Sequence, residues 1–234
     1  MKTKNGIIAV FGILLVCVCL LGFERIRQKS PTDVFYENIE SIVEVKAVTE
    51  AQESYGTAVF ADSNGTLVTN AHVVTVTRHG EQIGCDEIYI RFAQEEAYVP
   101  VELLALDEQD DLALLRCETG ERKIKGIAFG DDEKADFGDT VYAIGNTMNT
   151  GLAVSQGIIS IPDIRIEYEG KSRECIQADI TISNGNSGGA LLDASGKLIG
   201  ITSFRLKDTA GNVVYGYCYS VPLRIVKAFL EKNT

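Results

Sequence analysis

The 234-residue chain is poor in positive charge, has only two histidines, and has no Cys-x-x-Cys pair. Its 22 Lys and Arg stand against 33 Asp and Glu, which leaves a net charge of −11. An acidic chain repels phosphate groups, so nucleic acid is excluded as a partner and so is broad adhesion to anionic membranes. Without a Cys-x-x-Cys pair, zinc ligation is not expected, and we expect no metal site.

The first 30 residues differ from the rest because they are basic. They hold five Lys or Arg and one Glu, so they carry +4 and the remainder carries −15. Between the basic flanks, an uncharged apolar run of 18 residues covers 6–23. As a helix this run would be roughly 27 Å long, near the lower limit for crossing a bilayer.

No small-x-small cleavage site follows the apolar run. We therefore favour an uncleaved signal anchor, which holds the chain in the cell membrane by a single pass through residues 6–23. A cleaved signal peptide is the alternative. We expect the N-terminus in the cytoplasm and the globular part outside the cell. Basic residues flank both ends of the apolar run, so the positive-inside rule favours this orientation only weakly.

Four cysteines lie in the globular part, at Cys85, Cys117, Cys175 and Cys218. Outside the cell they could form two disulfides, with three connectivities available. Four buried thiols are the alternative, and the sequence does not choose between the two.

From Ile42 onward, short segments with period-two alternation and many β-branched residues predict an all-β fold. A stretch rich in charge and glycine divides these segments into two groups. The expected organisation is an anchor at 1–30, a first β-lobe at 31–120, a linker at 121–136 and a second β-lobe at 137–234. Expected strands cover 42–48, 56–61, 66–69, 87–92, 99–105, 112–116, 140–144, 153–161, 174–178, 189–192, 198–204 and 213–221, with short helices at 33–40 and 223–232. Strands of this number and spacing are typical of β-barrels or a sandwich.

Three motifs in this β-rich part carry nucleophilic chemistry. Ser187 lies between glycines in Asn184-Gly185-Asn186-Ser187-Gly188-Gly189, His72 lies in Thr69-Asn70-Ala71-His72-Val73, and Asp111 begins the apolar run Leu112-Ala113-Leu114-Leu115. The chain order His, Asp, Ser is that of the chymotrypsin-type triad. Each motif alone has a structural explanation, as a turn serine, a solvated histidine or a capping aspartate, and it is their combination that indicates a catalytic site.

In such a site Ser187 is the nucleophile and His72 the general base, while Asp111 orients the imidazole. The amides of Gly185 and Ser187 form the oxyanion hole. Asp110 is a direct rival for the acidic role, and we choose Asp111 because it adjoins the apolar run. The other histidine, His79, lies in an expected loop and receives no role.

The chain resembles a trypsin-like serine protease of the HtrA/Deg type over about residues 42–223. Besides the three motifs, the resemblance rests on Gly56-Thr57-Ala58, Gly138-Asp139-Thr140-Val141-Tyr142-Ala143-Ile144-Gly145-Asn146, Gly157-Ile158-Ile159-Ser160 and Gln177-Ala178-Asp179. It implies two antiparallel six-stranded β-barrels of the chymotrypsin/trypsin-like type. It also implies an endopeptidase that needs no metal or cofactor and acts on polypeptides outside the cytoplasm, in protein quality control or regulated cleavage.

The sequence departs from that family in three places. No PDZ domain is expected after the protease part, Thr147 stands where the family often has proline, and Ser183-Asn184 replaces the usual Asn-Pro or Asn-Arg before Gly185. The last change falls in the loop that shapes the oxyanion hole. A catalytically silent, protease-like module that binds extracytoplasmic polypeptides is therefore the alternative to an active enzyme. An esterase of the α/β-hydrolase type is disfavoured, because that fold orders its triad Ser, Asp, His.

Specificity and assembly are predicted only in outline. Thr181, Ile182, Ile201, Thr202 and Ser203 are expected to line the primary substrate pocket, where no acidic residue is expected to meet Lys or Arg. A small or medium aliphatic residue before the scissile bond is the resulting prediction. Members of the family often form trimers through an N-terminal aromatic segment, which Phe35 and Tyr36 could supply. We favour their packing on their own barrel instead.

Overall fold

The computed structural model describes residues 28–78, 81–206 and 210–234. The expected membrane anchor at 6–23 lies outside these residues. Within the described ranges, no helix combines the length and the apolar character needed to cross a bilayer.

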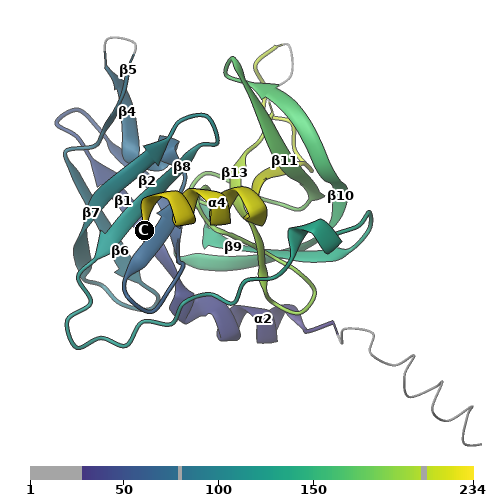
Figure 1. Ribbon diagram of the computed structural model, residues 1–234, viewed down its shortest axis with the longest axis horizontal. Coiled ribbons are helices and arrows are strands. Elements are labelled where there is room, and N and C mark those ends of the chain that lie inside the picture. Colours follow the sequence, from purple (N-terminus) through teal and green to yellow (C-terminus); the bar gives the residue numbers. More distant parts are fainter. Residues whose placement is uncertain (1–27, 79–80, 207–209) are drawn as a thin grey trace, which may run out of the picture.

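The described chain forms an all-β fold of two six-stranded antiparallel rings side by side (Figure 1). In the first ring the order is β1-β2-β3-β8-β7-β6, and the ring closes because β1 pairs with both β2 and β6. Its strands are β1 (Ile42–Val48), β2 (Glu53–Phe60), β3 (Thr66–Thr69), β6 (Glu87–Phe92), β7 (Tyr98–Asp107) and β8 (Leu112–Cys117). The second ring follows the order β10-β11-β14-β13-β12-β9. It consists of β9 (Thr140–Asn146), β10 (Leu152–Tyr168), β11 (Lys171–Asp179), β12 (Ala190–Leu192), β13 (Leu198–Phe204) and β14 (Cys218–Pro222).

Each ring has its own apolar interior, and a third apolar cluster joins the two rings. This cluster takes buried side chains from both rings, among them Leu112 and Leu114 from β8 and Ile144 from β9. Two helices complete it: α2 (Pro31–Asn38) contributes Val34, and α4 (Leu223–Asn233) contributes Phe229. Because burial of apolar surface is the main stabilising term in folding, this shared cluster holds the rings against one another.

The helix α2 begins two residues earlier than the sequence suggested. Ser30 caps it by accepting a hydrogen bond from the Asp33 amide, and Pro31 occupies the first turn, where its missing N–H costs nothing. Phe35 packs against the shared apolar cluster, as we favoured, whereas Tyr36 is 65% exposed. The helix lies against the second ring, to which Asn38 donates a hydrogen bond at the Gly196 carbonyl (3.1 Å).

Three further features were not expected from the sequence. A single helical turn, α3 (Ala71–Val74), follows β3, and a small hairpin of β4 (Thr75–Arg78) and β5 (Glu81–Gly84) extends from the first ring. The third is the length of β10, which with β11 forms a tall hairpin above the second ring (Figure 1). By contrast, β14 (Cys218–Pro222) is shorter than the strand predicted at 213–221.

The four cysteines of the globular part are free thiols, which is the second of the two alternatives left by the sequence. Cys117, Cys175 and Cys218 are buried and Cys85 is half-buried. Burial raises the pKa of Cys175 and of Cys218 to about 12, so neither thiol forms a reactive thiolate at neutral pH.

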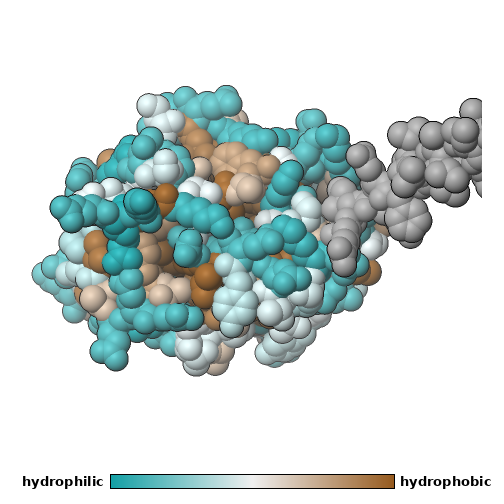
Figure 2. Space-filling view, turned by 90° about the horizontal axis from the view of Figure 1, so that it is seen from below, coloured by the Kyte–Doolittle hydropathy of each residue, from teal (hydrophilic) through white to brown (hydrophobic). Residues whose placement is uncertain are grey.

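The face of the molecule seen in Figure 2 is mostly hydrophilic, with apolar side chains gathered in a hollow near its centre. A polar surface of this kind agrees with the net charge of −11. The catalytic motifs meet at the seam between the rings.

Candidate active site

His72 and Asp111 are in direct contact at the seam. His72 lies on the one-turn helix α3, and its Nδ1 is 2.8 Å from Asp111 Oδ2. The His72 amide donates to the other carboxylate oxygen, Oδ1, at 3.0 Å. The Ser203 hydroxyl of β13 also donates to Asp111 Oδ2, at 2.7 Å. Within the described residues, Asp110 makes no hydrogen bond to His72, so the structure brings together the pair that the sequence favoured.

Asp111 occupies a turn between β7 and β8 and has a left-handed backbone, with φ of 56°. A side chain other than glycine in this conformation costs about 1–3 kcal/mol, and it persists where the surroundings determine it. Here the Asp111 carbonyl accepts hydrogen bonds from the Ala71 amide (3.1 Å) and the Asn70 side chain (2.9 Å). The Thr69-Asn70-Ala71-His72 motif therefore holds both the backbone and the carboxylate of Asp111.

Two consecutive turns present Ser187. The Asn186 amide donates to the Ser183 carbonyl and the Gly189 amide to the Asn186 carbonyl. The third position of each turn is a glycine with positive φ, Gly185 at 93° and Gly188 at 83°. A Cβ at either glycine would lie 2.0 Å from a backbone oxygen. Both the angle and the lack of space thus require glycine on either side of Ser187.

The carbonyl groups of this loop are held away from its amides. The Asn184 carbonyl accepts from the Met148 amide (2.8 Å), and the Gly185 carbonyl accepts from the buried Thr57 hydroxyl (2.7 Å). The Thr57 amide donates to the Ser187 carbonyl (2.9 Å). In the part of the chain that the structure describes, the N–H groups of Gly185 and Ser187 have no hydrogen-bond acceptor. Two free amides on a loop whose carbonyls are fixed can bind a developing oxyanion.

Two of the three departures around this loop, Thr147 and Asn184, have side-chain hydrogen-bond partners, whereas the buried Ser183 hydroxyl has none among the described residues. The Thr147 hydroxyl donates to Asn186 Oδ1 (2.9 Å), and Asn184 Oδ1 accepts from Arg205 (3.1 Å). Thr147 and Asn184 therefore tie the loop to neighbouring residues.

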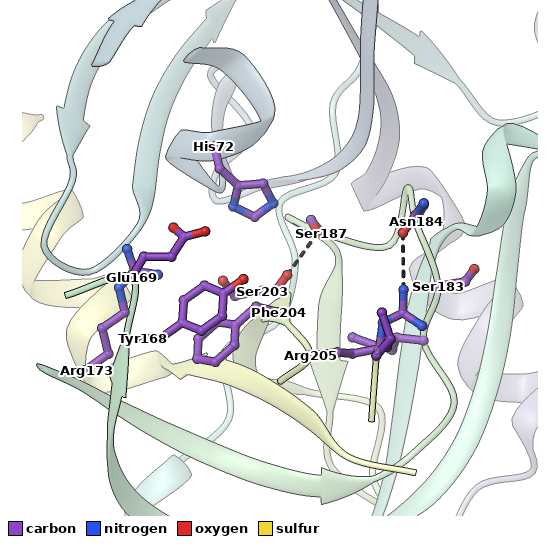
Figure 3. A pocket seen from close by; sticks show the side chains of 12 residues that line it. His72, Tyr168, Glu169, Arg173, Ser183, Asn184, Ser187, Ser203, Phe204 and Arg205 are labelled. Carbon is purple, nitrogen blue, oxygen red and sulfur yellow. Dashed lines mark hydrogen bonds between the residues drawn. The ribbon is translucent and has the colours of Figure 1, made fainter. Parts of the chain in front are cut away.

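The Ser187 hydroxyl faces the seam beside the imidazole of His72 (Figure 3). It donates to the Ser203 carbonyl at 2.9 Å and, among the described residues, makes no hydrogen bond to His72. Ser203 consequently touches two of the three catalytic candidates, Ser187 through its carbonyl and Asp111 through its hydroxyl.

A cavity of about 250 Å³ opens beside Ser187 and His72 (Figure 3). Of the five predicted pocket residues, only Ile182 and Ser203 line it. Thr181 is exposed, Ile201 is buried in the shared apolar cluster, and the Thr202 hydroxyl donates to the Asn186 carbonyl. A register shift between Thr202 and Phe204 interrupts the alternation of β13, which explains why neighbouring positions of this strand have such different surroundings.

Sequence reasoning missed the opposite wall of the cavity, which comes largely from the tip of the β10–β11 hairpin. Tyr168, Glu169 and Arg173 lie there, and Phe204, Arg205 and Val213 also line the cavity. The signal was present in Glu169-Gly170, a two-residue turn between alternating segments, which is typical of a tight hairpin.

Burial and the nearby charges have opposing effects on the pKa of His72. Burial lowers the pKa of His72, but the charge of Asp111 and its hydrogen bond outweigh burial and raise that pKa above its ordinary value. Glu169 adds to the increase and Arg173 subtracts from it. For Asp111, burial raises the pKa, yet the charge of His72 and the hydrogen bonds from His72 and Ser203 hold it below its usual value. Asp111 is therefore ionised at neutral pH, the state that can stabilise an imidazolium ion.

Comparison with known proteins agrees with this geometry. Residues 56–201 match the trypsin-like peptidase domain. The serine endoprotease DegS of Haemophilus influenzae is 31% identical over 178 residues, which cover 76% of this chain and 49% of DegS. A probable periplasmic serine endoprotease of the DegP-like kind from Brucella suis is 31% identical over 183 residues, which cover 78% of this chain and 33% of that protein.

Among solved structures, the HtrA-type protease AlgW with a bound tripeptide superposes with a TM-score of 0.74 at 27% identity. The match covers 87% of this chain and 63% of AlgW. The chain thus spans about half the length of DegS and a third of the DegP-like protein. The match over most of the globular part, together with the fold, shows that this chain belongs to the trypsin-like serine proteases of the HtrA type.

Proposed function

We propose that the protein is a membrane-anchored serine endopeptidase that cleaves exported or misfolded polypeptides outside the cytoplasm. The observation that carries the proposal is that Ser187 and His72 line one cavity, with Asp111 bonded to His72 and with two loop amides that have no acceptor among the described residues. The names of the relatives support an extracytoplasmic endoprotease, since one is described as periplasmic and the AlgW structure holds a peptide.

The reaction follows from the groups in the site. Rotation about the Ser187 Cα–Cβ bond moves the hydroxyl from the Ser203 carbonyl toward the imidazole. His72 takes the hydroxyl proton as Oγ attacks the scissile carbonyl carbon, and the amides of Gly185 and Ser187 bind the oxyanion. When the C–N bond breaks, His72 returns the proton to the leaving amine. Water then hydrolyses the acyl-enzyme with His72 again as the base, and Asp111 stabilises the imidazolium in each step.

The cavity lining supports the predicted preference for a small or medium aliphatic residue before the scissile bond. Ile182, Phe204 and Val213 provide apolar surface. Glu169 is an acidic group on the lining, but Arg173 and Arg205 share the cavity with it and disfavour a basic side chain. Cleavage of a peptide library should therefore occur after Val, Ala or Ile. Efficient cleavage after Arg would refute this specificity.

Labelling with a fluorophosphonate tests the catalytic proposal directly, because the probe reacts only with an activated serine. We expect the label on Ser187, located by mass spectrometry, and its loss in His72→Ala. Ser187→Ala should lower peptide turnover by about 10⁶-fold while the protein remains folded.

One observation favours the silent binding module as the second candidate: the Ser187 hydroxyl is bonded to the Ser203 carbonyl rather than to His72. Absence of labelling, even with unfolded casein present, combined with casein binding would support that candidate. Anchoring is tested separately, because a protein held through residues 6–23 stays with the membrane during alkaline extraction, whereas a variant without these residues does not.

A further inference from the structure

The tip of the β10–β11 hairpin is bonded to the turn that carries Asp111, although the two belong to different rings. Arg173 Nε donates to the Gln109 carbonyl (3.0 Å), and its Nη2 donates to the Glu108 carbonyl (3.3 Å). Lys171 donates to the same Glu108 carbonyl (2.8 Å) and pairs with its carboxylate (3.2 Å). In return, the Gln109 side chain donates to the Ser172 carbonyl (2.6 Å).

Arg173 is the buried centre of this contact. It is 6% exposed, and its guanidinium lies 5.7 Å from the centre of the Tyr168 ring and 6.0 Å from that of Phe204. The rings of Tyr168 and Phe204 are themselves stacked at 4.0 Å. A planar guanidinium held by aromatic faces and bonded to two consecutive carbonyls has little freedom to move.

The bonded turn needs outside support. Asp111 has a left-handed backbone, and Glu108 and Gln109 of the same turn are exposed and lie outside the ring strands. Asp107 supports the turn locally by accepting from the Gln109 and Asp110 amides. Arg173 supplies a contact to the outer side of the turn from the second ring. The aspartate is thereby supported on two sides, by α3 and by the hairpin.

We propose that Arg173 is a positioning residue for the catalytic pair: by fixing the Glu108 and Gln109 carbonyls, it aligns Asp111 with His72. The inference rests on the proposed function, since it gives a role within the same site. The field of Arg173, which lowers the pKa of His72, is a separate effect on the same imidazole.

Three variants of the full-length protein separate alignment from charge and from general stability. Arg173→Lys keeps the charge but loses the planar fork, and Arg173→Met removes both while it keeps an apolar stem against the rings. Arg165→Met is the matched control, because Arg165 lies on the same hairpin, is 68% exposed and pairs with Glu174 away from the turn. Thermal unfolding first establishes a temperature at which all three are folded.

Two readouts are measured at that temperature: the rate of fluorophosphonate labelling of Ser187, and the downfield proton signal of His72 Nδ1, which reports its hydrogen bond to Asp111. We expect both Arg173 variants to label about 10- to 100-fold more slowly, the cost of a misplaced catalytic group. We also expect the Nδ1 signal to weaken in both variants and to remain unchanged in Arg165→Met.

Labelling of Arg173→Lys and Arg173→Met at the control's rate would overturn the proposal. Slow labelling with an intact Nδ1 signal would also overturn it, since Arg173 would then act on the ligand rather than through Asp111. The Nδ1 signal needs no catalytic activity, and the chain has only one other histidine, His79, to assign. If the wild-type protein is not labelled, the proposed function fails, while the signal still decides whether Arg173 positions the pair.

Discussion

A Thr57→Val substitution should slow the chemical step, although Thr57 is not one of the three catalytic candidates. Thr57 lies on β2 and is fully buried. Its hydroxyl accepts from the Asn146 amide (2.8 Å) and donates to the Gly185 carbonyl (2.7 Å). Valine has nearly the same shape, so it fills the space of threonine but leaves both of these buried groups without a partner.

The magnitude follows from those two bonds. A buried polar group left unsatisfied costs about 1–3 kcal/mol, so the loss of stability is about 2–6 kcal/mol if the loop does not relax. For a domain of this size, about 1 kcal/mol shifts Tm by roughly 2–4 °C. The catalytic effect comes from Gly185. Once its carbonyl has lost the hydrogen bond from Thr57, the backbone of Gly185 can rotate and move its amide away from the oxyanion. Removal of an oxyanion donor costs about 10²–10³ in rate, and a loosened donor should cost up to about 10².

The assay compares Thr57→Val with Thr57→Ser, which keeps the hydroxyl and loses only a methyl group. The rate of fluorophosphonate labelling at Ser187 is measured well below the Tm of both variants. We expect the valine variant to label about 10- to 100-fold more slowly than the serine variant. Equal rates in two folded variants would refute the reasoning, because the oxyanion loop would then keep its shape without the Thr57 bond.

Three further predictions follow from the structure. Asp111→Asn should reduce turnover by about 10⁴-fold, whereas Asp110→Asn should have a small effect; the reverse ranking would show that the wrong aspartate was chosen. Because the pKa of His72 is raised, its neutral, basic form is lost earlier as pH falls, so the acid limb of kcat/KM should lie above the ordinary histidine pKa. Asp111, Glu169 and Arg173 are the charged groups that act on this imidazole. Glu169→Gln removes a charge that raises the pKa of His72, so the acid limb should move to lower pH. An unchanged acid limb would show that Glu169 does not influence the pKa of His72. In a thiol-labelling experiment on the native protein, Cys85 should react while Cys117, Cys175 and Cys218 remain protected until unfolding, and any crosslink among the four would contradict the structure.

The general fold could be predicted because its strands have strong local patterns. In Ile42–Val48, β-branched residues and alternation agree, and this segment pairs as β1 with strands on both sides. The length of β10 could not be read in the same way. Several positions in its second half are only half-buried, so its extension depends on pairing with β11 rather than on an apolar pattern.

The site was predictable where the backbone demands one residue type. The glycines around Ser187 are required by positive φ and by backbone atoms 2.0 Å from their missing side chains, and such requirements remain visible in a sequence. The pocket was less predictable: its residues were chosen from the segment just before Ser187 and from the strand Ile201-Thr202-Ser203, and of these Thr181, Ile201 and Thr202 do not line the cavity. A register shift in β13 and a hairpin from elsewhere in the ring decide the lining, and neither is a local property of the sequence.

Three hydrogen bonds that support the site share one property: each of them joins the two rings. Thr57 reaches from β2 to the loop of Ser187, Ser203 reaches from β13 to Asp111, and Arg173 reaches from β11 to the turn before Asp111. Each bond depends on the relative position of the rings, which the apolar cluster between them maintains. Neither ring can therefore hold a competent site alone. Because hydrogen-bond strength falls steeply with distance and angle, a small displacement at the seam would disturb all three bonds before either ring unfolds. Catalytic activity should thus be more sensitive to the seam than stability is, and partners or ligands that act on the seam would have the most direct control over the enzyme.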